Sequence, residues 1–419
     1  MRALYTVLLY AMMPYVWFRL AWRSRRDRGY LRHVGERLGF GSTADEGAIL
    51  IHAVSVGEVQ AALPLLDVML EQRRGPFLLT TMTPSGRRRG ESLFSGRVVQ
   101  RYLPWDLPGA IRRFLARTAP RVVIVLETEL WPNLIHACAE RSIPLVYVNA
   151  RLSARSAAGY HRFRSLFAPA LARVNAVAAQ TNEDAARLVA TGACPERVVV
   201  TGNTKLDVAV PAAARESGQL LRHQIGPSRR VWIAASTHEG EEEMVLDAFS
   251  RVRGEVPGCC LILVPRHVDR AGRIASLVRR RGYSVSLRTE GFDASADVLL
   301  GDTMGELPVL YAASDLAFVG GSLVDIGGHN LLEPAVLGIP ALTGPNTRNF
   351  SDLAASLAAV GAVRVVRDAE DLTGTVIDLL QDPNRRHRMG EEGREFVMSN
   401  RGARERTMAV IDRLLGSSV

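Results

Sequence analysis

Lysine is almost absent from this chain of 419 residues. Of the 52 lysine and arginine side chains, 51 are arginine and only Lys205 is lysine. Codon bias could leave one chance survivor, or this one position could require the compact ammonium group that arginine does not offer. Composition alone favours neither explanation, so the surroundings of Lys205 have to decide between them.

Cysteine is also scarce. Cys138, Cys194, Cys259 and Cys260 show neither C-x-x-C spacing nor a cysteine and histidine pattern typical of metal sites. A chain of this length buries a core large enough to fold without disulfides. We therefore expect reduced thiols in a cytoplasmic body, with no disulfide scaffold and no metal site.

Acidic residues are fewer than basic ones, and the formal net charge is +9. Such a charge first suggests a nucleic-acid partner. However, residues 1–41 contain eight arginines against Asp27 and Glu36, so this segment alone carries +6 and the other 378 residues only +3. A body this close to neutral argues against a DNA or RNA channel, and no nucleic-acid partner is expected.

Residues 1–22 are expected to form a membrane-anchor helix. Residues 3–18 carry no charge and contain Pro14, and the basic residues follow this stretch, which reverses the order of a secretion signal. The stretch is slightly short for a bilayer span, so a marginal span and a helix lying in the interface both fit, and a buried helix is the alternative. The basic flank favours an anionic, cytoplasmic leaflet; it comprises Arg19, Arg23, Arg25, Arg26 and Arg28.

The body alternates short apolar runs with helix-length segments. Because the runs are continuously apolar, they indicate strands buried on both faces, as in parallel sheets covered by helices. Residues 208–230 lack a strand pattern and contain Pro211, Gly218, Gly226 and Pro227, so we expect a linker there. The expected fold is α/β, with two Rossmann-like doubly wound domains, 23–207 and 231–419, facing a cleft.

Ligands of such sheets bind beyond the carboxyl ends of the strands. Glu58 follows the run 48–54 at a helix start, where it could act as a general base or simply stabilise the helix. Glu127 follows the run 121–126 together with Glu129, and burying two unpaired carboxylates would be costly. Lys205 lies just before the expected linker, a context that favours a role with a phosphate or a developing anion.

The second half also places polar groups after its apolar runs. Pro265, Arg266 and His267 follow one run, and a loop over Gly301–Leu307 follows another. Asn330 and Glu333 have the spacing of a helix cap and its capping-box partner, although Glu333 could also accept two ribose hydroxyls. The glycine-rich runs match no dinucleotide or Walker pattern, but together these strand ends indicate a nucleotide-type donor.

The chain resembles the 3-deoxy-D-manno-octulosonic acid (Kdo) transferases, which add Kdo from CMP-Kdo to lipid A precursors. The resemblance covers nearly the whole chain, with several long motifs in one order. The family has the GT-B type of fold, with the donor held mainly by the C-terminal domain. The motifs are His52–Glu58, Glu127–Asn133, Asn149–Ser156, Ser236–Glu241, Leu263–His267, Gly301–Leu307 and Phe318–Glu333.

The resemblance implies a role for each matching residue. Glu58 matches the catalytic base, and Glu127 and Lys205 match positions that stabilise the transition state. The one difference at these sites is Leu331, where proline can stand in other members. The residues that would contact CMP are Pro265, Arg266, Met304, Gly305, Glu306, Asn330, Leu331, Leu332 and Glu333.

The expected activity is therefore transfer of Kdo from CMP-Kdo to a lipid A precursor, lipid IVA, in lipopolysaccharide biosynthesis. We expect an inverting reaction without metal or cofactor, at the cytoplasmic face of a bacterial inner membrane to which the N-terminal helix anchors the enzyme. One alternative is another GT-B glycosyltransferase that uses a UDP-sugar and a membrane lipid. A membrane-tethered scaffold is a second alternative, which intact carboxylates at several strand ends disfavour.

Overall fold

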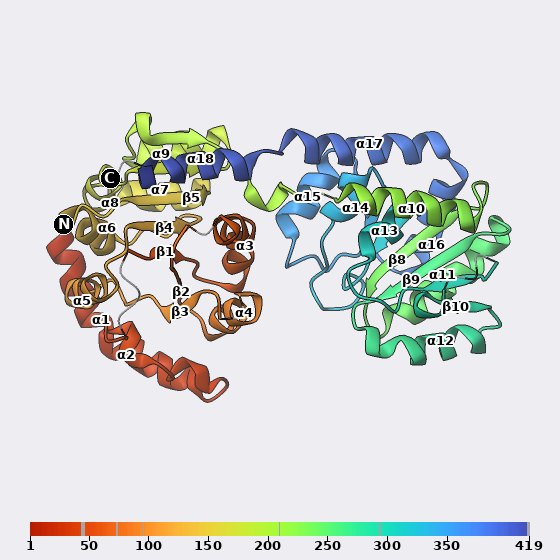
Figure 1. The fold of residues 1–419 in the computed structure, drawn as a ribbon, viewed down its shortest axis with the longest axis horizontal. Helices are drawn as coiled ribbons and strands as arrows, with labels where there is room; N and C mark the ends of the chain where they lie inside the picture. The colour runs from red at the N-terminus through yellow and green to blue at the C-terminus, as the bar shows by residue number, and fades with distance from the viewer. Residues whose placement is uncertain are drawn as a thin grey trace. The chain divides into compact units, whose positions relative to one another are not determined.

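The computed structural model describes residues 1–42, 47–72, 74–94, 96–208, 210–291, 293 and 295–416. The chain forms two compact units. Unit 1 contains residues 1–207 and the chain from Gly402 onward, and unit 2 contains residues 208–401. Figure 1 shows both units as sheets covered by helices.

Unit 1 is built on a parallel sheet with the strand order β3-β2-β1-β4-β5-β6-β7. Helices α3, α4 and α18 pack on one face of the sheet, and α5, α6, α8 and α9 on the other. The strands are β1 (Ile49–His52), β2 (Phe77–Thr81), β3 (Val99–Tyr102), β4 (Val122–Leu126), β5 (Leu145–Ala150), β6 (Ala176–Ala179) and β7 (Val198–Val200). The helices are α1 (Arg2–Ser24), η1 (Arg28–Tyr30), α2 (Val34–Arg37), α3 (Val56–Glu71), α4 (Pro84–Phe94), α5 (Pro108–Thr118), α6 (Pro132–Glu140), α7 (Ala154–Arg162), α8 (Arg164–Leu171), α9 (Asn182–Thr191), η2 (Pro195–Arg197), η3 (Thr204–Leu206) and α18 (Ala403–Gly416).

Unit 2 repeats the plan with the strand order β10-β11-β9-β8-β12-β13-β14. One face packs on α11, α12 and α16, and the other on α10 and α13. The strands are β8 (Val231–Thr237), β9 (Cys260–Pro265), β10 (Val285–Leu287), β11 (Val298–Leu300), β12 (Leu316–Val319), β13 (Ala341–Thr343) and β14 (Val363–Val365). The helices are α10 (Ala212–Ile225), α11 (Glu241–Glu255), η4 (Val268–Arg270), α12 (Ala271–Arg280), η5 (Arg288–Glu290), α13 (Leu307–Ala312), α14 (Leu332–Leu337), α15 (Ser351–Ala359), α16 (Ala369–Gln381) and α17 (Pro383–Ser399).

The expected α/β class with two Rossmann-like sheets is confirmed. Three strands went unpredicted, namely β3, β7 and β14, and each of them lies at an edge of its sheet. Edge strands pair on one side only and keep part of their side chains in solvent, so β3 and β14 carry polar residues within the strand, whereas β7 is apolar but only three residues long. Val199 and Val365, for example, are exposed.

The prediction of a linker over 208–230 was wrong, because most of this segment is helix α10. Leu221 and Ile225 of α10 are buried in the core of unit 2. Gly218, read as a linker signal, lies where α10 packs against α13, and a Cβ there would come within 2.4 Å of the Ala312 Cβ. This glycine therefore permits close helix packing.

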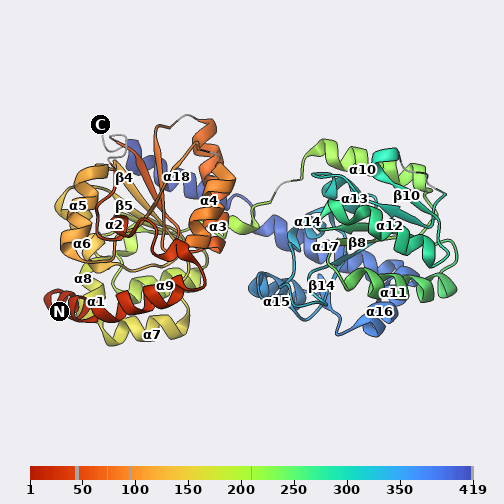
Figure 2. The same ribbon diagram turned by 90° about the horizontal axis from the view of Figure 1, so that it is seen from below.

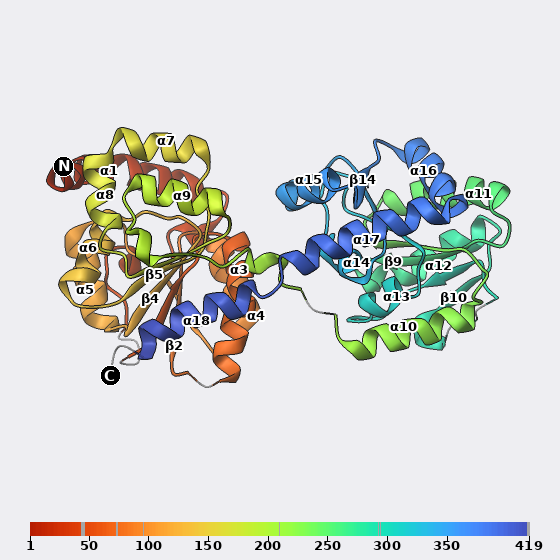
Figure 3. The ribbon, with the colours of Figure 1, turned by 90° about the horizontal axis from the view of Figure 1, so that it is seen from above.

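The expected C-terminal boundary also differs from the structure. Helix α18 belongs to unit 1 rather than to the second domain, and Figure 3 shows it lying across the sheet of unit 1. Met408 and Ile411 of this helix join the core beneath α3. The last helix thus completes a core whose other members precede residue 150.

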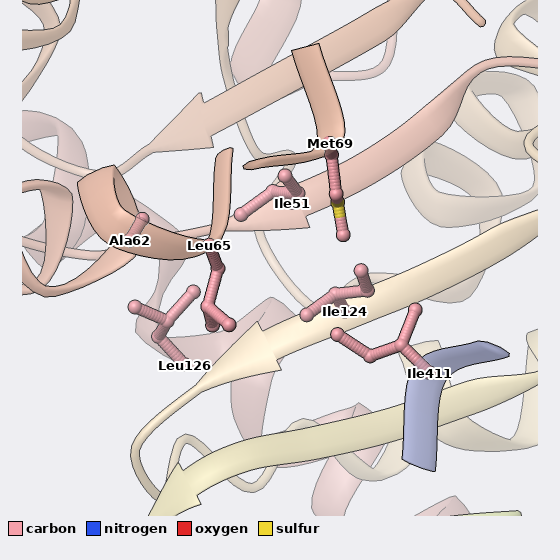
Figure 4. Close-up of a pocket in the computed structure, with 7 residues that line it drawn as sticks. All are labelled: Ile51, Ala62, Leu65, Met69, Ile124, Leu126 and Ile411. Atoms are coloured by element: carbon pink, nitrogen blue, oxygen red, sulfur yellow. The ribbon is translucent and has the colours of Figure 1, made fainter. Parts of the chain in front are cut away.

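Truncation of Ile411 to alanine is expected to destabilise unit 1 by about 3 kcal/mol, as for other large-to-small core changes. Figure 4 shows Ile411 beside a small cavity among apolar side chains, and the shorter side chain would enlarge this cavity. The change in the unfolding midpoint measures the effect. Glu405→Ala, on an exposed position of the same helix, should shift stability by less than about 0.5 kcal/mol. Equal effects of the two changes would contradict a core role for α18.

Candidate active site

Glu58 lies in the first turn of α3, just beyond β1. Its carboxylate accepts a hydrogen bond from the Val54 N–H at 2.8 Å and another from the Ser55 hydroxyl at 3.2 Å. The residue is only 8% exposed. Burial raises the pKa of Glu58 to about 7, and the nearby charges of Glu127 and Glu129 act in the same direction. A carboxylate with a pKa near neutrality suits proton transfer at physiological pH.

Glu127 and Lys205 form an ion pair at the same edge of the sheet. The Lys205 ammonium donates to a Glu127 carboxylate oxygen at 2.7 Å. Glu127 follows β4 with φ of 55°, a left-handed conformation that is uncommon outside glycine and turns the chain sharply at the strand end. The ion pair accounts for a cation at this position, while a role of Lys205 in the reaction stays a prediction.

Asn149 fixes the segment that carries Lys205. It too has a left-handed conformation, with φ of 53°, and its side-chain oxygen accepts from the Thr204 N–H at 3.1 Å. The Asn203 side chain accepts from the Lys205 N–H. The strand end at β5 therefore positions η3, and with it the lysine, beside Glu127.

Glu129 is a member of this group that had been assigned no role of its own. Burial raises its pKa, and the charge of Glu127 adds to this effect. Three carboxylates thus lie close enough to influence one another. The sequence signal for Glu129 was its position two residues after Glu127.

Replacing Lys205 by methionine is expected to lower kcat by about 10- to 100-fold. A buried donor to a developing anion is worth about 10²- to 10³-fold, and the half-exposed Lys205 should fall below this range because solvent screens its charge. Steady-state rates with a saturating donor measure the effect, with Lys205→Arg retaining part of the activity. A kcat unchanged in Lys205→Met would show that the lysine has no role in the reaction.

The residues expected to contact the donor lie at the carboxyl edge of unit 2. Pro265 ends β9 and is buried. The Arg266 N–H donates to the Thr237 carbonyl at 3.0 Å, and Arg266 itself is exposed. Burial raises the pKa of Glu333, while the Arg266 charge opposes this rise, so the two side chains lie near each other. These groups match a site for an anionic ligand that also carries hydroxyls.

Asn330 and Glu333 interact directly, but not as the expected capping box. Helix α14 starts at Leu332, so Leu331 rather than Asn330 stands at the cap position. The Asn330 oxygen accepts from the Leu332 N–H at 3.1 Å, and its amide donates to Glu333 at 3.2 Å. Leu331 and Leu332 are both buried.

The loop with Met304, Gly305 and Glu306 is built differently. Arg288 donates three hydrogen bonds to the Glu306 carboxylate, and these bonds lower the pKa of Glu306. Met304 is 72% exposed and Gly305 has φ of +82°. The Glu306 carboxylate is therefore engaged in holding the loop, whereas Met304 is free to contact a ligand.

Glu241 is a site residue whose role sequence reasoning missed. It is fully buried, and its carboxylate accepts from the backbone N–H groups of His238, Gly321, Ser322 and Leu323 at 2.7–3.0 Å. It thereby fixes the glycine-rich loop after β12. The motif Ser236–Glu241 was recognised, but the sequence does not show which backbone N–H groups donate to the Glu241 carboxylate.

Three histidines surround this loop. The His238 and His329 Nε2 atoms are 2.9 Å apart, and His267 contacts His238 edge to face with ring centroids 5.8 Å apart. Burial, together with the neighbouring His238, lowers the pKa of His329 to about 4. Within the described residues, no three His, Cys, Asp or Glu side chains are placed to hold a metal ion.

Comparisons with known proteins agree with these motifs. A family model described as 3-deoxy-D-manno-octulosonic-acid transferase (kdotransferase) matches residues 32–208, and one described as glycosyl transferases group 1 matches residues 285–396. A 3-deoxy-D-manno-octulosonic acid transferase of Haemophilus influenzae is 39% identical over 427 residues, which cover 100% of both chains.

Two solved structures are also similar. The C-terminal CMP-Kdo binding domain of WaaA from Acinetobacter baumannii is 31% identical, covers 45% of this chain and 99% of its own, and has a TM-score of 0.43. MurG of Acinetobacter baumannii has a TM-score of 0.55 at 12% identity, covering 87% of this chain and 99% of its own, which supports the GT-B type of fold alone. From the full-length match and the family model, the chain belongs to the Kdo transferase family of glycosyltransferases.

Proposed function

We propose that this glycosyltransferase moves Kdo from CMP-Kdo to the lipid A precursor lipid IVA, with inversion and without a metal ion. The observation that carries the proposal is the carboxylate of Glu58, buried at a strand end with its pKa raised to about 7. Family membership supports Kdo as the transferred sugar. The acceptor, the stereochemistry and the role of the base are our inferences.

In the proposed reaction, Glu58 takes the proton of the acceptor hydroxyl as the hydroxyl oxygen bonds to the anomeric carbon of Kdo. The bond from that carbon to the phosphate oxygen breaks at the same time, and CMP departs with the bonding electrons. Attack opposite the leaving group inverts the anomeric centre. The Glu127–Lys205 pair would stabilise charge that develops in this step.

Unit 2 would supply the donor contacts. Arg266 offers a charged fork for the phosphate of CMP, and Asn330 and Glu333 offer an amide and a carboxylate for the nucleoside hydroxyls. The remaining contacts would come from Pro265, from the main chain of Leu331 and Leu332, and from the loop of Met304, Gly305 and Glu306.

We further propose that the enzyme works at the cytoplasmic face of a bacterial inner membrane. Helix α1 is, among the described residues, the one helix long and apolar enough to cross a membrane. A phosphorylated lipid acceptor resides in such a membrane, so an anchor would keep the enzyme near its substrate.

Transfer of radiolabelled sugar to lipid IVA tests the proposal. Purified full-length enzyme is supplied with CMP-Kdo in one reaction and with a UDP-sugar in another, each with and without EDTA. We expect label in lipid only from CMP-Kdo, with equal rates in both EDTA arms. Label from the UDP-sugar would favour another lipid glycosyltransferase, and loss of activity in EDTA would contradict the metal-free mechanism.

A further inference from the structure

Helix α1 is attached to unit 1 along one side. The Tyr5 hydroxyl donates to the buried Asp106 at 3.1 Å, and the Asn133 amide donates to the Thr6 hydroxyl at 3.1 Å. Near the other end of the helix, Trp17 meets Trp105 edge to face with centroids 5.3 Å apart. Figure 2 shows α1, in red, lying along the surface of unit 1.

The attached side is a single helical stripe. Its members recur at intervals of three and four residues, as one face of a helix requires. Leu20 is buried and the others are partly buried or bonded to unit 1. They are Arg2, Tyr5, Thr6, Leu9, Met13, Val16 and Leu20.

The opposite side of α1 is apolar and in solvent. Phe18 is 71% exposed and Val7 63% exposed, although α1 is apolar overall and such side chains are normally covered. The one charged residue between Leu4 and Trp22 is Arg19, which lies at the border of this face. Its large members are Leu4, Val7, Leu8, Tyr15, Phe18 and Trp22.

A basic cluster borders the exposed face. All its members are exposed, and none of them forms a salt bridge within the part of the chain that the structure describes. Such arginines are each worth about 1 kcal/mol at an anionic membrane surface. The cluster comprises Arg19, Arg23, Arg25, Arg26 and Arg28.

We propose that α1 does not span the bilayer but lies flat in the interface of an anionic membrane, clamped to unit 1. An apolar face bordered by arginines is the arrangement of interfacial helices. A spanning α1 would either pull Tyr5 and Thr6 away from Asp106 and Asn133, or draw the charged surface around Glu140 into hydrocarbon. The flat orientation keeps every observed contact and covers the exposed apolar face with lipid.

The location of α1 has a consequence for the acceptor. Asp106 lies in the loop after β3, and Asn133 lies at the start of α6, which follows β4. Both mark the carboxyl edge of the sheet, the edge that also carries Glu58 and Glu127. This deepens the proposed function, on which it rests for the acceptor, because it places the membrane surface at the edge of unit 1 that bears the base.

Cross-linking separates the two orientations. Arg2 and Glu140 are exposed and their side chains lie 3.4 Å apart across the α1–α6 contact. The variant Arg2→Cys/Glu140→Cys, in a Cys194→Ala background, is treated in intact membranes with a short bismaleimide. A flat helix predicts an intramolecular cross-link, with the single-cysteine variants as controls. A spanning helix would hold residue 2 about 30 Å away across the bilayer and give none, which would overturn the proposal.

Vesicle flotation tests the lipid-facing side without any substrate. We expect Val7→Glu/Phe18→Glu to lower the fraction bound to phosphatidylglycerol vesicles at least tenfold, while Leu220→Glu, at a 66% exposed position of α10, binds as wild type. Phosphatidylcholine vesicles should bind the wild type more weakly. Unchanged binding of the double variant would contradict the proposal. Because no donor or acceptor is present, failure here is distinct from failure of the proposed reaction.

Discussion

Replacing Glu58 by glutamine should lower kcat by about 10²- to 10⁴-fold, the usual contribution of a general base. Glutamine keeps the size of the side chain and an oxygen that can accept from the Val54 N–H, so the local fold should survive. It cannot take up the acceptor proton. Glu71→Gln, at the exposed end of the same helix, is the matched control and should keep wild-type kcat. A folded Glu58→Gln enzyme with near-normal kcat would show that another group is the base.

The pH dependence adds a second readout of the same residue. Because burial raises the pKa of Glu58 to about 7, the base is mostly protonated at pH 6 and mostly ionised at pH 8. The rate of the wild-type enzyme should therefore rise with pH up to about 8 and then level off. Glu58→Gln should lose this ascending limb, which a merely structural change would leave in place. A limb retained in the variant would assign it to a different group.

The interior strands of the fold were predictable because their sequences are continuously apolar. Runs such as Val122–Leu126 are apolar at every position since both faces of the sheet are covered. The edge strand at Val99–Tyr102 carries Gln100 and Arg101 and offers no such signal. Gly218 was misread because a glycine that breaks a chain and one that lets two helices touch look alike in sequence.

The sequence indicated which residues to consider for the candidate site, but it did not indicate how those residues interact. Glu58, Glu127 and Lys205 stood out because each follows a strand or precedes the expected boundary. The 2.7 Å bond between Glu127 and Lys205 joins residues 78 apart, and nothing local encodes such a pairing. The pKa of Glu58 likewise depends on burial by distant segments. The family resemblance supplied roles for these residues, while the geometry supplied the partners.

Loss of the Glu241 carboxylate should strongly destabilise unit 2. Four backbone N–H groups depend on it, and each buried donor left without a partner costs about 1–3 kcal/mol. Glu241→Ala should therefore destabilise unit 2 by about 4 kcal/mol or more, observed as a lowered unfolding midpoint. Glu243→Gln, at an exposed position two residues further along the same helix, should change stability by less than about 0.5 kcal/mol.

The geometry also predicts that the conservative variant Glu241→Gln loses less stability than Glu241→Ala. One carboxylate oxygen accepts from His238 and Gly321 and the other from Ser322 and Leu323, so glutamine can serve one pair while its amide faces the other pair donor to donor. Glu241→Gln should thus lose roughly half of what Glu241→Ala loses, because two of four donors stay paired. Equally small effects of the two variants would mean that the loop rearranges to satisfy its own N–H groups, and a Glu241→Gln protein as stable as the wild type would mean that Glu241 merely fills space.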